Sequence, residues 1–207
     1  MNVMYATDEN YVEIMAVSIK SVMLTNKWKK IHFYLVEDGI SKESRQALEA
    51  MISESGNEVT FIPKPDIRGM LGVELKTLRW SDSAYSRLFL KELFGIDNKI
   101  EKLLYMDCDT LIVDSLKELW NTDISDYLGA ACLECMSNMH KRIIGAKPKD
   151  NYINTGMLLL NVKHWMDENI QDVEADFIRK YHGKTEYVDQ GVINGTVSNR
   201  FKLVSPR

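Results

Sequence analysis

The sequence predicts an α/β protein in which a mostly parallel central sheet is flanked by helices. Its first 63 residues alternate short apolar runs with segments whose apolar residues recur at helical spacing. That alternation of strand and helix is typical of a parallel sheet whose connections are helices. A chain of 207 residues with 45% hydrophobic and 27% charged residues suits such a fold. We therefore expect one α/β domain over residues 1–207.

The N-terminal third gives the clearest elements. Residues 2–6, 31–40 and 58–63 carry apolar runs that predict three strands, the second followed by a turn. Between the first two strands, residues 12–23 repeat apolar positions at helical spacing. A second helix is expected after Ser41, whose hydroxyl is suited to cap the first turn.

The rest of the chain predicts less regular elements. We expect a loop at residues 64–81, a helix at 83–94, a strand at 103–106 and a short helix at 114–121 capped by Asp114 or Ser115. Strands follow at 128–134 and 155–162, separated by a mobile basic loop at 135–152. Residues 164–182 predict a helix broken near Asn169, and residues 189–197 another helix before a last strand at 200–204.

Composition excludes several classes of protein. The net charge of −4 argues against a nucleic-acid binder, which needs a basic face. No apolar run approaches the roughly 18–20 residues of a membrane span, and the first residues lack the features of a secretory signal. We therefore expect a cytoplasmic protein. Cys108, Cys132 and Cys135 lack the second pair that a zinc site needs, so we expect free thiols.

The stretch "LLYMDCDTLIV" (residues 103–113) places two carboxylates within an apolar run. Residues two apart in an extended strand point the same way, so Asp107 and Asp109 are expected to project together and Cys108 into the apolar layer. A divalent cation with oxygen ligands would relieve their repulsion and leave positions open for phosphates. Asp8 follows another apolar strand, at the sheet edge where ligands of α/β proteins bind. A solvated turn remains the alternative.

Five segments, taken in order along the chain, resemble glycosyltransferase family 8. They are "YATDENY" (5–11), "YSRLFL" (85–90), "LLYMDCDTLIVDSLKELW" (103–120), "YINTGMLLLNVKHW" (152–165) and "DQGVING" (189–195). The family includes bacterial lipopolysaccharide galactosyl- and glucosyltransferases and the glycogenins. The resemblance implies a GT-A (nucleotide-diphospho-sugar transferase) fold and retaining transfer of a hexose from UDP-glucose or UDP-galactose. It also implies Mn²⁺, with Mg²⁺ as a substitute, bound by the D-x-D motif.

The resemblance also implies the partners and the donor site. The acceptor would be a saccharide or a glycolipid, a longer form would bind the inner face of the membrane, and a homo-oligomer is compatible with the sequence. Ala6 and Asp8 would contact the uracil and ribose, with Tyr11 beside the base, although Tyr11 could simply start a helix. The implied donor-binding residues are Ala6, Asp8, Tyr11, Arg87, Asp107, Cys108, Asp109, Asn154, Thr155, Asp189 and Gln190.

Within that set, Asp107 would reach the ribose and the metal, and Asp109 would be the more direct metal ligand. Arg87 would contact the sugar or phosphate region of the donor. Asn154 would bind the transferred sugar beside Thr155, although asparagine is also a common turn residue.

Asp189 and Gln190 would flank the reacting carbon, and Glu134 loosely matches a family carboxylate near the sugar. An aspartate at position 189 is also compatible with a plain helix cap. Two catalytic routes stay open. In a front-face route Gln190 would stabilise charge, whereas in a double displacement Asp189 would act as the nucleophile.

The sequence departs from the family at its C-terminal side. The motif H-x-x-G-x-x-K-P-W, which supplies a third metal ligand and a diphosphate-binding lysine, is absent from the 207 residues. We therefore expect weaker metal and UDP-sugar binding and low turnover, and a non-catalytic UDP-sugar-binding protein is the alternative. A phosphatase of the haloacid-dehalogenase type is less favoured, because Thr110-Leu111 stands where that superfamily has Gly-Thr.

Overall fold

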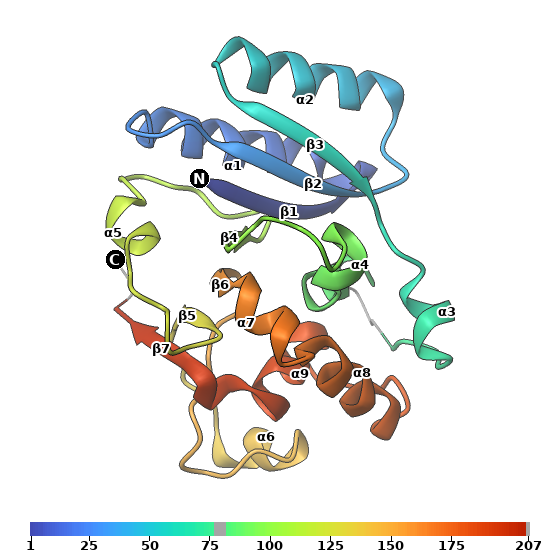
Figure 1. Cartoon of the computed structure of the whole chain (residues 1–207). Coiled ribbons are helices and arrows are strands. Elements are labelled where there is room, and N and C mark those ends of the chain that lie inside the picture. Colours follow the sequence, from blue (N-terminus) through green and yellow to red (C-terminus); the bar gives the residue numbers. More distant parts are fainter. Residues whose placement is uncertain (77–81, 206–207) are drawn as a thin grey trace.

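The structure, a computed structural model, describes residues 1–76 and 82–205. In this part of the chain seven strands form one sheet in the order β3-β2-β1-β4-β6-β5-β7 (Figure 1). The strands are β1 (Asn2–Asp8), β2 (His32–Asp38), β3 (Glu58–Pro63), β4 (Lys102–Met106), β5 (Gly129–Cys132), β6 (Met157–Asn161) and β7 (Phe201–Val204).

Helices connect and cover these strands. The α-helices are α1 (Val12–Thr25), α2 (Lys42–Glu54), α3 (Ile67–Leu71), α4 (Leu90–Phe94), α5 (Lys117–Trp120), α6 (Asn138–Ile143), α7 (Val162–Asp167), α8 (Ile170–Lys180) and α9 (Val188–Thr196). Short 3₁₀ helices are η1 (Glu9–Tyr11), η2 (Asp82–Leu88) and η3 (Ser198–Arg200). Within the described residues, none of the helices has both the length and the apolar character that crossing a bilayer requires.

The direction of the strands decides which loops meet. β1 pairs in parallel with β2 and β4, β2 with β3, and β5 with β7. β6 runs antiparallel to both of its neighbours, β4 and β5. The sheet is therefore mostly parallel, as predicted. Because β6 is reversed, the residues that precede it lie at the edge where β1 and β4 end.

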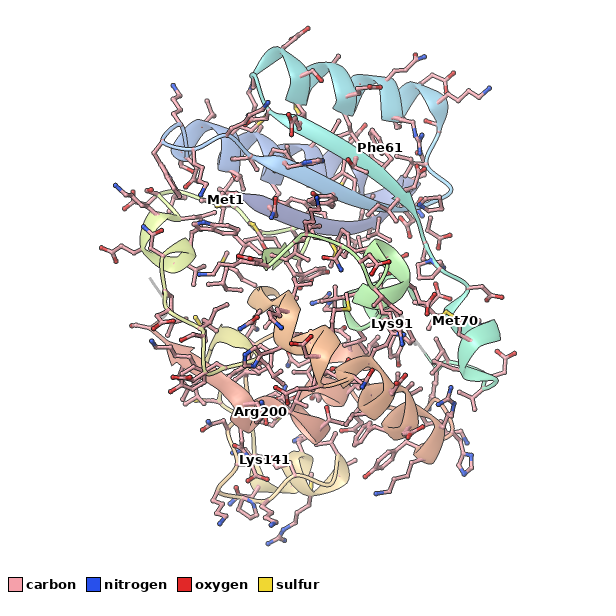
Figure 2. The ribbon with its side chains drawn as sticks, viewed as in Figure 1. Met1, Phe61, Met70, Lys91, Lys141 and Arg200 are labelled. Carbon is pink, nitrogen blue, oxygen red and sulfur yellow. The ribbon has the colours of Figure 1, made fainter. Side chains whose placement is uncertain are left out.

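The sheet separates two apolar cores. Alternate residues of one strand point to opposite faces, so Val3 and Tyr5 of β1 pack with α1 and α2, whereas Met4 packs with η2, α4 and α7 to α9. β4 divides in the same way, with Leu104 on the α1 side and Tyr105 on the other. Figure 2 shows side chains filling the space on both sides of the sheet. Burial on both faces explains why these strands are almost uniformly apolar.

The first 63 residues fold as predicted, in the order β1, α1, β2, α2, β3, and Ser41 caps α2 by accepting a hydrogen bond from Ser44 N–H. The predicted single helix over residues 83–94 is wrong. The chain forms η2 and then α4, with the break at Phe89. Every residue from 85 to 90 is buried, which one face of an α-helix cannot achieve because it buries only every third or fourth residue.

Four further expectations are corrected or confirmed. The supposed loop at 135–152 contains α6, because Ser137 caps its first turn through His140 N–H. The short helix expected at 114–121 is limited to α5, and its first turn follows Leu116 without a side-chain cap. The break near Asn169 is confirmed, since this residue adopts a left-handed conformation with φ of 51° between α7 and α8. The loop expected at 64–81 contains α3, and residues 77–81 lie outside the described part.

Candidate active site

A cavity of about 620 Å³ lies at the carboxyl ends of β1 and β4. Ten of the eleven residues predicted to bind the donor line it, and Asn154 is the exception. The lining residues are Ala6, Thr7, Asp8, Asn10, Tyr11, Ser83, Ala84, Arg87, Tyr105, Asp107, Cys108, Asp109, Thr155, Tyr187, Val188, Asp189 and Gln190. Segments from five regions of the sequence thus meet at this edge of the sheet.

The two aspartates of the D-x-D motif lie on a turn, so the expectation of an extended strand is wrong at this point. β4 ends at Met106, and the carbonyl of Asp107 accepts a hydrogen bond of 3.2 Å from Thr110 N–H. Both carboxylates still face the same cavity, and Cys108 is buried as predicted. The Cys108 thiol donates to the carbonyl of Ala6 at 3.2 Å, which ties the turn to the end of β1. Burial raises the pKa of this thiol to about 12, so it stays protonated.

The two oxygens of the Asp107 carboxylate have different surroundings. Oδ1 accepts hydrogen bonds from Arg87 Nη2 at 2.8 Å and from the Tyr105 hydroxyl at 3.0 Å. Burial raises the pKa of Tyr105 well above its ordinary value, so the hydroxyl remains a donor. Within the described residues, Oδ2 of Asp107 and both oxygens of Asp109 accept no hydrogen bond. These oxygens are therefore the ones free to bind a ligand.

Arg87 is buried at the back of the cavity and joins two carboxylates. Its Nε lies 3.2 Å from Asp189 Oδ2, its Nη1 donates to the carbonyl of Thr155 at 2.6 Å, and its Nη2 donates to Asp107. The guanidinium also stacks on Tyr105, 3.7 Å from the ring centroid. Burial alone would lower the pKa of Arg87, but Asp189 and Asp107 raise it, so the group stays charged. Direct contact of Arg87 with the donor stays a prediction.

Asp189 lies in the first turn of α9 but is more than a helix cap. The residue is 5% exposed, and its carboxylate accepts a hydrogen bond from the Thr155 hydroxyl at 3.1 Å, besides its contact with Arg87. Burial raises the pKa of Asp189 to about 6, and Arg87 offsets only part of that effect. The cap of α9 is Tyr187, so the plain-cap interpretation of Asp189 is not supported.

The reversed strand β6 brings residues 154–156 beside the D-x-D turn. Asp107 N–H donates to the carbonyl of Gly156 at 2.8 Å, continuing the β4–β6 pairing by one residue. A Cβ atom at Gly156 would lie 3.0 Å from Asp107 Oδ2 and 3.1 Å from Asn154 Oδ1. The glycine of the "INTG" segment thus leaves room for the carboxylate that faces the cavity.

Two amide side chains are held by one carboxylate beside the cavity. Glu134 Oε2 accepts hydrogen bonds of 3.1 Å from both Asn154 Nδ2 and Gln190 Nε2. The Gln190 oxygen in turn accepts from Thr155 N–H at 3.2 Å. Asn154 therefore belongs to the site through Glu134, although it does not line the cavity. These contacts follow from the pairing of the segments around residues 133 and 153, which the sequence pattern did not reveal.

Some lining residues were not anticipated. Tyr187 and Val188, directly before Asp189, both have left-handed backbone conformations, with φ of 56° and 54°. Such conformations cost on the order of 1–3 kcal/mol each and concentrate at functional sites. A Cβ atom at Gly191 would lie 1.8 Å from the carbonyl of Glu186, so only glycine fits this tight entry to α9. The sequence signal that could have revealed this entry is the glycine of "DQG".

The basic segment at residues 135–152 does not line the cavity. Lys141 Nζ donates to the carbonyls of Pro148 and Asp150, within its own loop. Figure 2 places Lys141 on α6, at the opposite end of the view from Phe61 on β3. Among the described lining residues Arg87 is the only cation, against the carboxylates of Asp8, Asp107, Asp109 and Asp189.

The donor set of the turn fits a hard divalent cation. Mg²⁺ and Mn²⁺ prefer oxygen ligands and bind with a few carboxylates plus substrate phosphates and water. Asp107 Oδ2 and the Asp109 carboxylate meet that requirement. Within the described residues no group of three or more histidine, cysteine, aspartate or glutamate side chains is arranged to hold a metal ion. Any such ion would therefore share its coordination sphere with ligand or solvent.

A sequence model of glycosyl transferase family 8 matches residues 2–207. The chain belongs to this family. It is 24% identical to the lipopolysaccharide 1,3-galactosyltransferase of Salmonella typhimurium over 100% of this chain and 62% of that protein. It is 25% identical to the lipopolysaccharide 1,2-glucosyltransferase of Escherichia coli over 93% of this chain and 57% of that protein. The chain thus spans less than two thirds of the length of these relatives.

The fold is also that of a galactosyltransferase of known structure. The galactosyltransferase LgtC, solved with donor and acceptor sugar analogues, superposes with a TM-score of 0.86 and is 30% identical. The match covers 97% of this chain and 72% of LgtC. The predicted GT-A fold of this family 8 chain is confirmed, and the phosphatase interpretation is not supported.

Proposed function

We propose that this family 8 chain transfers a hexose, glucose or galactose, from a UDP-sugar to a hydroxyl group of a saccharide or glycolipid acceptor, with retention at the anomeric carbon. The observation that carries the proposal is the cavity at the carboxyl ends of β1 and β4, which brings the D-x-D carboxylates together with the Gln190 amide. The family 8 relatives that act on lipopolysaccharide support the class of reaction.

The charge of the cavity supports a cation requirement. Four carboxylates face one guanidinium, and that guanidinium is already bonded to Asp107 and Asp189. A diphosphate would be repelled from such a cavity unless a cation came with it. Mn²⁺ bound by Asp107 and Asp109 would neutralise the charge that develops on the leaving diphosphate.

The nucleotide end of the donor suits the end of β1. Ala6 and Asp8 lie where β1 ends, and Asp8 Oδ1 accepts a hydrogen bond of 3.0 Å from Asn10 N–H, which fixes the start of η1. Tyr11, half exposed at the rim, presents a ring that can stack on a base. We assign the uracil to Tyr11 and the ribose to Asp8 and Asp107.

The sugar end suits the amide cluster and favours the front-face route. The Asp189 carboxylate is buried and bonded to Arg87 and Thr155, so it is poorly placed to attack carbon. The Gln190 amide is oriented by Glu134 and Thr155 and can stabilise positive charge on the sugar ring. In this route the acceptor oxygen bonds to the anomeric carbon as the bond to UDP breaks, and a diphosphate oxygen takes the acceptor proton.

The test is release of UDP from UDP-glucose and UDP-galactose by the 207-residue chain, measured with Mn²⁺ and with a chelator. We expect release from one of the two donors with Mn²⁺ and loss of release in Asp107→Asn. Asp126→Asn, an exposed aspartate away from the cavity, is the matched control and should behave as the wild type. Metal-dependent UDP binding without release from any donor would favour the non-catalytic UDP-sugar-binding protein instead.

A further inference from the structure

A carboxylate outside the cavity ties the rim of the candidate active site to the start of α2. Glu9 Oε2 accepts a hydrogen bond from Ser41 N–H at 2.7 Å, and Glu9 Oε1 accepts one from the Ser44 hydroxyl at 2.8 Å. β1 and β2 run in parallel, so η1 after β1 and the start of α2 after β2 lie at the same edge of the sheet (Figure 1). Glu9 does not line the cavity, whereas its neighbours Asn10 and Tyr11 do.

The two hydrogen bonds complete a capping arrangement that spans two segments. In a capping box, a serine at the N-cap of a helix is followed three positions later by a glutamate, whose carboxylate accepts a hydrogen bond from the N-cap N–H. Ser41 is the N-cap of α2 and accepts from Ser44 N–H at 3.1 Å, but the third position holds serine instead of glutamate. Glu9 of η1 supplies the carboxylate that α2 lacks. The start of α2 is thus capped by a residue 32 positions earlier in the chain.

The electrostatics of this contact favour an ionised Glu9. The hydrogen bonds from Ser41 N–H and from the Ser44 hydroxyl lower the pKa of Glu9 below its ordinary value. The N-terminus of a helix also carries a partial positive charge, which favours a carboxylate close to it. Glu9 is therefore a charged acceptor for both of its donors at neutral pH.

The segment η1 depends on this contact because packing does not hold it. None of its three residues is buried. Asp8 Oδ1 accepts from Asn10 N–H at 3.0 Å, and Val12 N–H donates to the Glu9 carbonyl where α1 begins. Those two bonds are local to the segment. The Glu9 carboxylate, in contrast, joins η1 to α2, whose buried residues pack in the core on that side of the sheet.

We propose that Glu9 is a positioning residue: its carboxylate holds η1 on α2 so that Tyr11 meets the base of the UDP-sugar in a fixed orientation. The inference rests on the proposed function, because that function supplies the nucleotide. Without the tether, η1 would also adopt orientations in which the Tyr11 ring does not face the base. The apparent affinity for the nucleotide then falls in proportion to the time that η1 spends in the binding orientation.

The two ends of the donor should respond differently to loss of the tether. We assign the diphosphate to a cation at Asp107 and Asp109, on a turn that is held by Arg87 and Gly156 rather than by η1. Loss of the Glu9 carboxylate should therefore weaken binding of UDP and leave binding of inorganic pyrophosphate unchanged, both with Mn²⁺. A general loss of structure at the site would weaken both ligands.

The test is calorimetric titration of UDP and of inorganic pyrophosphate, each with Mn²⁺, into the 207-residue chain and its variants. We expect Glu9→Ala to lower UDP affinity about tenfold, which corresponds to η1 holding the binding orientation about a tenth of the time. In the UDP-release assay it should raise KM for the donor without lowering kcat. Glu9→Gln keeps an oxygen that accepts from Ser41 N–H and should retain most of the affinity. Glu49→Ala, an exposed change farther along α2, is the matched control and should bind both ligands as the wild type.

A further variant separates positioning of η1 from capping of α2. Adding Ser44→Glu to Glu9→Ala restores a capping box within α2, since Ser41 is then followed by glutamate at the third position. This change does not restore the link to η1. We expect it to recover the melting temperature that Glu9→Ala loses and to leave UDP affinity reduced.

Three results would overturn the inference. The first is equal UDP affinity in Glu9→Ala and the wild type. The second is an equal fall in the affinities for UDP and pyrophosphate, which would mean a general loosening of the site. The third is recovery of UDP affinity on adding Ser44→Glu, which would mean that Glu9 acts only through the stability of α2. A wild type that binds no UDP would contradict the proposed function and this inference together, whereas wild-type binding that Glu9→Ala leaves unchanged contradicts the inference alone.

Discussion

At the scale of single residues, Arg87 holds the candidate active site together. One buried guanidinium contacts Asp107, Asp189 and the carbonyl of Thr155, and these groups come from three separate segments. A planar fork with five donors can satisfy all of them, which a lysine ammonium cannot. Breaking a buried ion pair leaves an uncompensated charge and typically costs about 3–5 kcal/mol. The same residue therefore contributes to stability and to the geometry of the D-x-D turn.

We expect Arg87→Lys to lower the melting temperature and to reduce UDP release by about 100-fold or more, because Asp107 and Asp189 lose their common partner. Calorimetric melting and the UDP-release assay measure the two effects. Arg68→Lys is the control, since Arg68 is 46% exposed and pairs with Glu74 and Asp82, neither of which lines the cavity. Wild-type release by Arg87→Lys would show that the contacts of Arg87 with Asp107 and Asp189 are dispensable.

Glu174 is the second residue whose environment predicts a measurable effect. It is fully buried on α8, and neither carboxyl oxygen has a hydrogen-bond partner among the residues that the structure describes. Burial, together with repulsion from Asp189, raises the pKa of Glu174 well above its ordinary value. The folded chain therefore binds a proton at this site that the unfolded chain releases, so the free energy of unfolding decreases as the pH rises above the unfolded pKa.

Replacing Glu174 by methionine should stabilise the chain by about 1–3 kcal/mol at pH 8. The gain should be smaller at pH 5, because there the wild type loses less stability by keeping this carboxyl protonated in the folded state. Urea unfolding at the two pH values measures the difference. Asp172→Asn, an exposed change on the same helix, should stay within about 0.5 kcal/mol of the wild type. A wild type more stable than Glu174→Met at pH 8 would contradict the predicted pKa direction.

At the scale of elements, the reversed strand β6 and the helix α9 build the sugar end of the cavity. β6 runs against β4, so residues 154–156 lie beside Asp107. α9 is fixed to the same segment by Asn194, which accepts from Ile153 N–H at 2.7 Å and donates to the Ile153 carbonyl at 2.9 Å. Gln190 lies one turn earlier on α9 and is thereby aligned with Thr155.

Gly156→Ala tests the contact between β6 and the D-x-D turn. The added methyl would lie 3.0 Å from Asp107 Oδ2, so the carboxylate must shift by a few tenths of an ångström. The backbone of Gly156 is not left-handed, so the substitution adds no backbone strain. We expect metal-dependent UDP affinity to fall about tenfold while the free energy of unfolding changes little. Equal UDP affinity in calorimetry would show that the carboxylate has more freedom than the structure indicates.

Asn194→Ala tests the anchoring of α9. It leaves the buried Ile153 N–H and carbonyl without partners, which costs about 1–3 kcal/mol, and it releases the turn that carries Gln190. We expect a lower kcat in the UDP-release assay with a smaller change in KM for the donor. Asn199→Ala, an exposed asparagine bonded to Asn151 and Asp150, is the control. A loss of stability with unchanged kcat would mean that α9 keeps its position without this anchor.

At the scale of the whole molecule, the features that local sequence patterns determine could be predicted. The features that depend on contacts between residues far apart in the sequence could not. The first five elements follow from apolar periodicity within each segment, and the D-x-D motif from its apolar flanks. The turn at Asp107, the 3₁₀ helix η2 and the amide cluster depend on contacts between distant segments. Glu134 and Gln190 are 56 positions apart, and no local pattern brings them together. Glutamate is rarely buried, and tyrosine and valine rarely adopt a left-handed backbone conformation. The burial of Glu174 and the conformations of Tyr187 and Val188 therefore could not be predicted from residue preferences.

The acidic cavity at the carboxyl ends of β1 and β4 is the feature that links the fold to the proposed chemistry. Asp107 Oδ2 and Asp109 are its free carboxylate oxygens on the turn, and its one lining cation, within the described residues, is bonded to protein. A UDP-sugar should therefore bind only together with a divalent cation held by these two aspartates.

Calorimetric titration of UDP into the 207-residue chain, with Mn²⁺ and with a chelator, tests this claim most directly when Asp109→Asn is titrated beside the wild type. We predict that the wild type binds UDP only with Mn²⁺ and that Asp109→Asn loses this binding. UDP binding of equal affinity in the chelator, or by Asp109→Asn with Mn²⁺, would contradict it.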